Sequence, residues 1–137
     1  MSFIGRILQS LGGPRKHNPR AAADDGAAAE ALAAAFLGTQ GVRIIARNYR
    51  VRGGEIDLVG EEGNSLVFVE VRLRRNRDYG GAAASITPRK QQRIILAARH
   101  WLAAHPREAV PCRFDCVLLD GLDATRMEWI RNAFAAD

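Results

Sequence analysis

The chain has 137 residues, of which 47% are hydrophobic and 26% charged, a composition typical of one soluble globular domain with a substantial core. Its formal net charge of +5 and its pI near 10.0 favour an anionic partner, with nucleic acid first and an anionic membrane surface second. No apolar run reaches the roughly 18 residues that a membrane span needs, and no stretch has the build of a secretory signal peptide. We therefore expect no transmembrane segment and a cytoplasmic location.

The first part of the chain differs from the rest. Residues 1–20 predict a flexible basic N-terminal segment, and residues 21–137 predict a single domain. Three interpretations of the segment are open, namely a basic arm, a membrane-surface contact and a disordered terminus, and the pattern favours the last. The apolar residues at helical spacing that raise the membrane alternative are Phe3, Ile4, Ile7, Leu8 and Leu11.

An Ala-rich stretch follows, and residues 21–37 predict a helix. Its expected cap is either Asn18, with Pro19 as the first helical residue, or Asp24. Glu30 has two interpretations. It is either a plain surface residue or an acid drawn toward the acidic face of a neighbouring sheet.

Three strands are predicted next. Residues 42–51 form the first, and residues 54–74 form two more, joined by a tight turn at Gly63-Asn64. The basic loop that follows has the residues of a phosphate-contacting loop, although a solvated loop explains it equally well. It contains Arg72, Arg74, Arg75, Arg77, Tyr79, Gly80 and Gly81.

The hairpin register predicts an acidic face. Asp57 faces Glu70, and Glu55 faces Arg72, because side chains alternate between the faces of a strand. Two opposed carboxylates repel unless a cation lies between them, and their oxygens suit Mg²⁺ or Mn²⁺. The alternative is a solvated face with a Glu55–Arg72 salt bridge. The opposite face is expected to be apolar, with Ile56 facing Val71 and Leu58 facing Val69.

The second long helix has a clear predicted start, because Thr87 is a good cap and Pro88 a good first helical residue. It is expected to end near residue 105, with a buried face made of Ile94, Ala97, Ala98, Trp101 and Leu102. Cations crowd its first two turns against the helix dipole, an arrangement that makes sense if the helix start meets a phosphate. They are Arg89, Lys90 and Arg93.

Two further elements complete the pattern. Residues 113–119 predict a strand, and residues 127–134 a short strand or helical turn. Cys112 and Cys116 lie too far apart on one strand for a disulfide, about 13 Å, and are interpreted as buried thiols of a reduced protein. The order of elements predicts an α/β fold with a mixed central sheet flanked by helices.

This pattern resembles the YraN family of bacterial proteins, over about residues 22–134. The resemblance implies membership of the PD-(D/E)XK nuclease superfamily and similarity to archaeal Holliday junction resolvases. A restriction endonuclease-like αβββαβ core is therefore expected, and a homodimer is an expectation by the same analogy. The motifs that carry the resemblance are Glu30, Arg47-Asn48-Tyr49-Arg50, Gly54-Glu55-Ile56-Asp57-Leu58, Val67-Phe68-Val69-Glu70-Val71-Arg72, Tyr79-Gly80, Lys90 and Arg113-Phe114-Asp115.

The resemblance also implies a site. Asp57 and Glu70 match the metal-binding acids, and Glu30 matches the helix acid that assists them. Arg72 stands where the family's pattern has Lys, and Lys90 is a candidate substitute from the next helix. Glu55 belongs to the family's signature without an assigned role. Nucleic-acid contacts are expected from Arg74, Arg75, Arg77, Arg89, Lys90 and Arg93.

Two functions follow from these expectations. The first is a Mg²⁺- or Mn²⁺-dependent DNA endonuclease that hydrolyses phosphodiester bonds, with selectivity for branched DNA as a further expectation. The second is a nuclease-fold protein that binds nucleic acid or a protein with little or no catalysis, because Arg72 cannot lose its proton and act as a base. The acids Glu30, Asp57 and Glu70 favour the first, since a phosphate-binding module gains nothing from opposed carboxylates.

Overall fold

The computed structural model describes residues 19–74, 86–123 and 125–136, with side chains from residue 24 onward. Most of the predicted N-terminal segment, with its apolar residues, therefore lies outside the described residues. In chain order the elements are α2 (Pro19–Thr39), β1 (Arg43–Val51), β2 (Gly54–Glu62), β3 (Ser65–Arg74), α3 (Pro88–Ala104), β4 (Cys112–Asp120) and β5 (Met127–Phe134).

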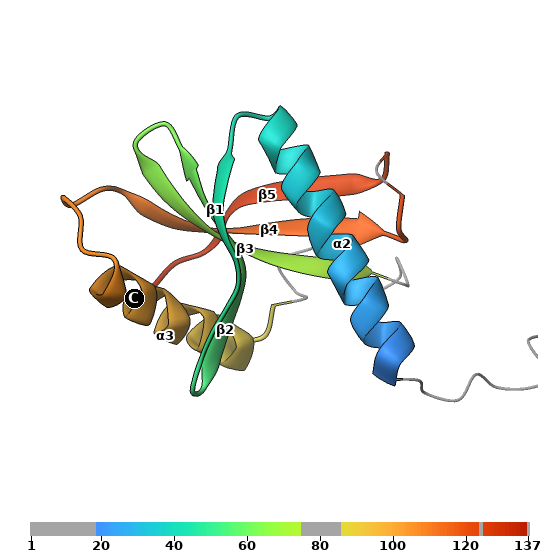
Figure 1. Ribbon diagram of the computed structural model, residues 1–137, viewed down its shortest axis with the longest axis horizontal. Coiled ribbons are helices and arrows are strands. Elements are labelled where there is room, and N and C mark those ends of the chain that lie inside the picture. The colour runs from blue at the N-terminus through green and yellow to red at the C-terminus, as the bar shows by residue number, and fades with distance from the viewer. Residues whose placement is uncertain (1–18, 75–85, 124, 137) are drawn as a thin grey trace, which may run out of the picture.

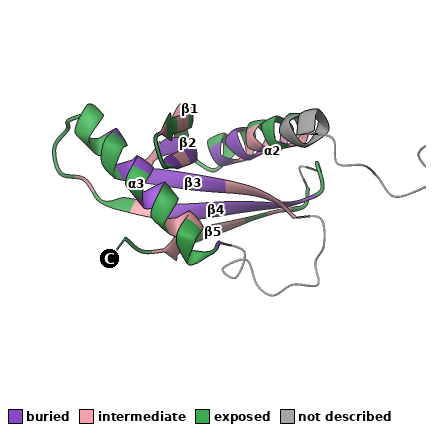
Figure 2. Ribbon diagram, turned by 90° about the horizontal axis from the view of Figure 1, so that it is seen from below, coloured by how far each residue is buried: buried purple, intermediate pink, exposed green. Residues whose placement is uncertain are grey.

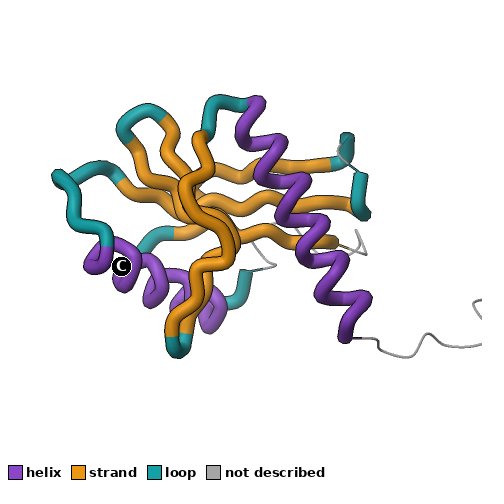
Figure 3. The backbone as a smooth tube through the Cα atoms, in the orientation of Figure 1, coloured by secondary structure: helices purple, strands orange, loops and turns teal. Residues whose placement is uncertain are grey.

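The strands form one mixed sheet in the order β1-β2-β3-β4-β5 (Figure 3). Strands β3 and β4 are parallel and connected through α3, and every other neighbouring pair is antiparallel. The predicted α/β fold with a restriction endonuclease-like core is confirmed (Figure 1). None of the described helices combines the length and the apolar character needed to cross a bilayer.

Two helix boundaries test the cap predictions. Helix α2 already begins at Pro19, so Asp24 lies inside the helix and does not cap it. Thr87 caps α3 as predicted, because its Oγ1 accepts a hydrogen bond from the Lys90 N–H at 3.1 Å. The last element, left open as a strand or a helical turn, is strand β5.

A hydrophobic cluster covers each face of the sheet. Strands β3 and β4 lie between the two clusters, and Figure 2 shows β4 buried over most of its length and β3 buried in its first part. The cluster under α3 includes Ile56, Phe68, Ile94, Trp101 and Leu118. The cluster under α2 includes Ala33, Leu37, Leu58, Val69 and Val117. Two sequence expectations were wrong, because Leu102 on α3 is 37% exposed and Cys112 is also exposed.

Strand β2 bends at Asp57, and the bend corrects the predicted hairpin. The register is confirmed as far as Leu58 opposite Val69, where the β2–β3 ladder ends. Ile56 packs in the cluster under α3, whereas Leu58 packs under α2, although the β1–β2 register runs without a shift through both residues. The predicted pairs Glu55–Arg72 and Ile56–Val71, and the single apolar face, were therefore wrong.

Helix α3 is seated directly on the start of β2. A Cβ atom at Gly54 would overlap the carbonyl oxygen of Arg93 and lie 3.2 Å from the Ala97 nitrogen. Only a residue without a side chain allows this contact between helix backbone and strand backbone. Gly54 therefore allows α3 to pack closely on β2.

A buried carboxylate ties β5 to β4. Asp115 is 0% exposed and accepts hydrogen bonds from Arg113 Nε at 3.0 Å, Trp129 Nε1 at 3.0 Å and the Asn132 N–H at 3.0 Å. The β4–β5 register shifts between Phe114 and Cys116, and Asn132 has a positive φ of 51°. Asp115 thus holds a β-bulge in place, which gives the Arg113-Phe114-Asp115 motif a structural role.

We expect Gly54→Ala to destabilise the fold by about 1–3 kcal/mol, because its methyl group must displace backbone rather than a flexible side chain. Chemical denaturation of both proteins measures the difference. Gly26→Ala is the matched control. Gly26 lies within α2, and a Cβ added there would have nothing within 4 Å, so this change should stabilise by about 0.5–1 kcal/mol. Equal effects of the two substitutions would contradict the close contact.

Asp115→Ala should lower the free energy of unfolding by about 3–5 kcal/mol, because it leaves the Arg113 guanidinium and two N–H donors without their buried acceptor. Glu108→Ala, at an exposed acid before β4, should stay within about 0.5 kcal/mol of the unaltered protein. Urea unfolding followed by tryptophan fluorescence measures both variants. A loss below about 1 kcal/mol at Asp115 would show that the bulge does not depend on the carboxylate.

Candidate active site

The site begins where β2 separates from β3. Asp57 lies one residue outside the last ladder pair, Leu58–Val69. The Val71 N–H has no backbone acceptor on β2 there, and it donates to the Asp57 side chain instead, at 2.8 Å from Oδ2. This hydrogen bond fixes the carboxylate between the two strands. Asp57 and Glu70 therefore lie together, as predicted, although they are not a ladder pair.

Glu70 is the most buried acid of the cluster, with 5% of its surface exposed. Burial, followed by contact with the Asp57 carboxyl, raises the pKa of Glu70 to about 8, whereas Lys90 acts in the opposite direction. A buried carboxyl beside another carboxyl holds its proton near neutral pH unless a cation compensates it.

Lys90 supplies a cation from the first turn of α3. Its Nζ lies 3.1 Å from Glu70 Oε2. Among the described residues, the Lys90 ammonium is the charged partner of this buried oxygen. The lysine is about one-third exposed, and it brings the ammonium group from the edge of the site to the buried acid.

Glu30 joins the cluster from α2, on the other side of the bend. Burial and the Asp57 carboxyl raise the pKa of Glu30 to about 7. With its amide nitrogen turned toward Glu30, Asn48 donates to both carboxylate oxygens, at 2.9 and 3.2 Å. Asn48 has a positive φ of 51°, a conformation that Asn tolerates better than most residues. Sequence reasoning did not assign Asn48, although its place in the Arg47-Asn48-Tyr49-Arg50 motif was a signal.

Arg72 lies near the same acids, on the outer part of β3. Cys116 pairs with Glu70 across the β3–β4 ladder, and the pKa of its thiol depends on the charges around it. Burial, together with the charges of Glu70 and Asp57, raises the pKa of Cys116 to about 12, whereas Arg72 and Lys90 act in the opposite direction. The prediction that Cys116 is a buried free thiol is confirmed, whereas its place beside the acids could not be read from the sequence.

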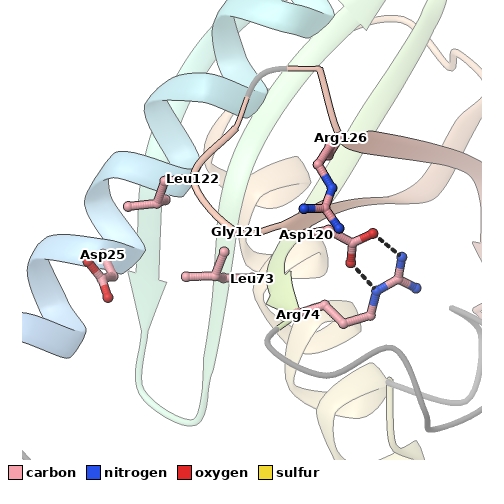
Figure 4. A pocket seen from close by; sticks show the side chains of 7 residues that line it. All are labelled: Asp25, Leu73, Arg74, Asp120, Gly121, Leu122 and Arg126. Atoms are coloured by element: carbon pink, nitrogen blue, oxygen red, sulfur yellow. Dashed lines mark hydrogen bonds and ion pairs between the residues drawn. The ribbon is translucent and has the colours of Figure 1, made fainter. Parts of the chain in front are cut away.

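Other predicted residues lie elsewhere. Glu55 is partnered by Arg50, at 3.7 Å, rather than by the acids of the cluster. The Arg74 guanidinium makes two hydrogen bonds to Asp120, at 2.7 and 3.1 Å, beside a pocket of about 460 Å³ (Figure 4). Arg89 and Arg93 are exposed on α3. Arg75 and Arg77 lie outside the described residues.

The three carboxyls form a chain, with Asp57 in contact with Glu30 on one side and Glu70 on the other. Across the described ranges, no three Asp, Glu, His or Cys side chains converge as a ready metal cluster. Two carboxylates suffice for Mg²⁺, which usually keeps several waters. The buried Oε2 of Glu70, which has the Lys90 ammonium at 3.1 Å as its charged partner, is a hard oxygen ligand that fits such an ion.

The chain is similar to proteins from several bacteria. A family model described as "Uncharacterised protein family UPF0102" matches residues 29–119, a range that contains the whole acid cluster and Lys90. A UPF0102 protein of Dechloromonas aromatica is 54% identical over 112 residues, which make up 82% of this chain and 89% of that protein. A UPF0102 protein of Nitrosomonas europaea is 53% identical over 113 residues, 82% of this chain and 95% of that protein.

The stability of the metal-free protein should fall as pH rises from about 4.5 to about 8. In this interval the folded state holds the Glu70 proton that the unfolded chain has released, so the folded state binds more protons and loses stability with rising pH. Glu70→Gln should flatten this fall, and Glu55→Gln, on the same hairpin, should not. Thermal unfolding in a pH series with a chelator measures the three slopes. Identical slopes would show that Glu70 does not titrate in this range.

Proposed function

The chain belongs to the uncharacterised UPF0102 family, the YraN family named above, and we propose that it is a metal-dependent nuclease that hydrolyses phosphodiester bonds. The observation that carries the proposal is the ion pair between Lys90 Nζ and Glu70 Oε2, at 3.1 Å. This ion pair supports the view that Lys90, on α3, provides the ammonium group that the family's motif lysine would provide from the position of Arg72 on β3.

Asp57 and Glu70 are the proposed holders of Mg²⁺ or Mn²⁺. Their oxygens are hard ligands, and burial together with the neighbouring Asp57 carboxyl raises the pKa of Glu70, an effect that a bound cation would oppose. A bound Mg²⁺ would lower the pKa of a water and stabilise the negative charge of phosphodiester hydrolysis. Glu30 orients Asp57 from the side of α2, and Asn48 holds Glu30 in that position.

The two cations of the site have different proposed roles. Lys90 lies beside Glu70, and its ammonium group is able to hold a phosphate oxygen. Arg72 presents a planar guanidinium that is suited to clamp a phosphate in bidentate fashion. Binding and orientation of the substrate are thus assigned to Arg72, and positive charge beside the metal-binding acid to Lys90.

DNA is the proposed substrate, with branched DNA as the finer proposal, because the chain is basic and the site resembles that of junction resolvases. A cytoplasmic location and a homodimer are part of the same proposal. The second candidate function is a nuclease-fold protein that binds nucleic acid or a protein with little catalysis. Arg72 in place of the motif lysine is the observation that favours it.

We expect Mg²⁺- or Mn²⁺-dependent cleavage of labelled linear, single-stranded, flapped or four-way-junction DNA. Asp57→Asn and Glu70→Gln should each lower the rate at least about 100-fold, because each removes a charged ligand while keeping its shape. Lys90→Met should lower it by a similar factor, and Arg72→Lys should retain cleavage. Gel analysis of the four substrates gives the rates.

Glu55→Gln is the matched control, because it removes an acid of the same hairpin that is paired with Arg50. Its rate should equal that of the unaltered protein. DNA binding without cleavage of any substrate, unchanged by Asp57→Asn and Glu70→Gln, would instead establish the second candidate function. Cleavage lost in Arg72→Lys but kept in Lys90→Met would reverse the roles of the two cations.

A further inference from the structure

The turn between β1 and β2 is docked on α3. A Cβ at Gly53, which has a positive φ of 86°, would lie 3.2 Å from Leu96 Cδ2, and the following Gly54 touches the α3 backbone. Arg52 precedes these two glycines in the same turn and is exposed. The β1–β2 turn that contains Arg52 is therefore held against helix α3.

The two elements that meet here, β1 and α3, carry basic residues and no acidic ones. Strand β1 and helix α3 contain no acidic residue along their 9 and 17 residues. Arg89 and Arg93 are exposed on α3, one helical turn apart, and no described acid forms an ion pair with them or with Arg52. Arg43, Arg74, Arg107, Arg113 and Arg131 pair with acids, whereas Arg47, Arg72, Arg99 and Arg126 also form no ion pair among the described residues, so the charge of α3 and its location, rather than the lack of pairs alone, single out this surface.

Arg89 and Arg93 lie on the part of α3 that also carries Lys90 of the candidate active site, and the turn with Arg52 packs against the same helix. Lys90 follows Arg89 directly and turns toward Glu70, whereas Arg89 and Arg93 stay exposed to solvent. Exposed cations without counter-ions near the start of a helix oppose the helix dipole and destabilise the helix. An external polyanion that covers this surface would remove that destabilisation.

We propose that Arg52, Arg89 and Arg93 form a phosphate track, which binds the nucleic-acid backbone beside the bond to be cleaved. This inference rests on the proposed function and deepens it, because it places the substrate across α3 and the β1–β2 turn. A track of side-chain cations contacts phosphates and carries no base specificity. Arg52 is the new member, since only the fold brings it to the helix.

The test is the salt dependence of binding to a labelled duplex, measured by fluorescence anisotropy with Ca²⁺ in place of Mg²⁺. Each lost phosphate contact should reduce the slope of log K against log salt by about 0.9. We expect this reduction in Arg52→Gln. The control is Arg126→Gln, which removes an exposed arginine before β5 and should leave the slope unchanged.

Three results would overturn the inference. If the unaltered protein binds no duplex, the track fails, while cleavage of the four DNA substrates still decides the proposed function. If it binds but Arg52→Gln behaves like Arg126→Gln, only the track fails. A loss of binding to vesicles with an anionic phospholipid, without a loss of duplex binding in Arg52→Gln, would assign the arginines to a membrane surface instead.

Discussion

The separation of β2 from β3 at Asp57 is the constraint on which the site depends. Two antiparallel strands that stayed paired beyond Leu58 would use the Val71 N–H in the ladder and would leave Asp57 on one regular face. Because the strands part, the Asp57 side chain takes over that N–H and is shared between α2 and β3. Acids from opposite sides of the sheet thereby come into one chain of contacts.

Neighbouring buried carboxyls destabilise a fold, and in this structure each carboxyl has a partner that offsets part of that destabilisation. Asn48 donates to Glu30, the Val71 N–H donates to Asp57, and Lys90 faces Glu70. Each acid thus has one positive or hydrogen-bonding partner from a different element. The compensation is incomplete, since the pKa values of Glu30 and Glu70 both remain raised. A raised pKa of this kind, on two carboxyls in one cluster, is typical of functional sites.

Much of this arrangement could be predicted from the sequence. The order of elements, the Thr87 cap and the pairing of Leu58 with Val69 follow from local rules of capping, alternation and turns. The bend at Asp57 could not, because it depends on how two helices pack on opposite faces. The role of Asn48 and the reach of Lys90 also depend on that packing.

Lys90 lies in a different element from the acid that it faces, and 20 positions further along the chain. A search for a linear signature with a lysine two positions after Glu70 would pass over this sequence, since Arg72 stands there. The charge that the signature stands for is nevertheless beside the acid in space. Recognition of such proteins therefore has to compare three-dimensional charge positions, with the helix included, rather than spacing along one strand.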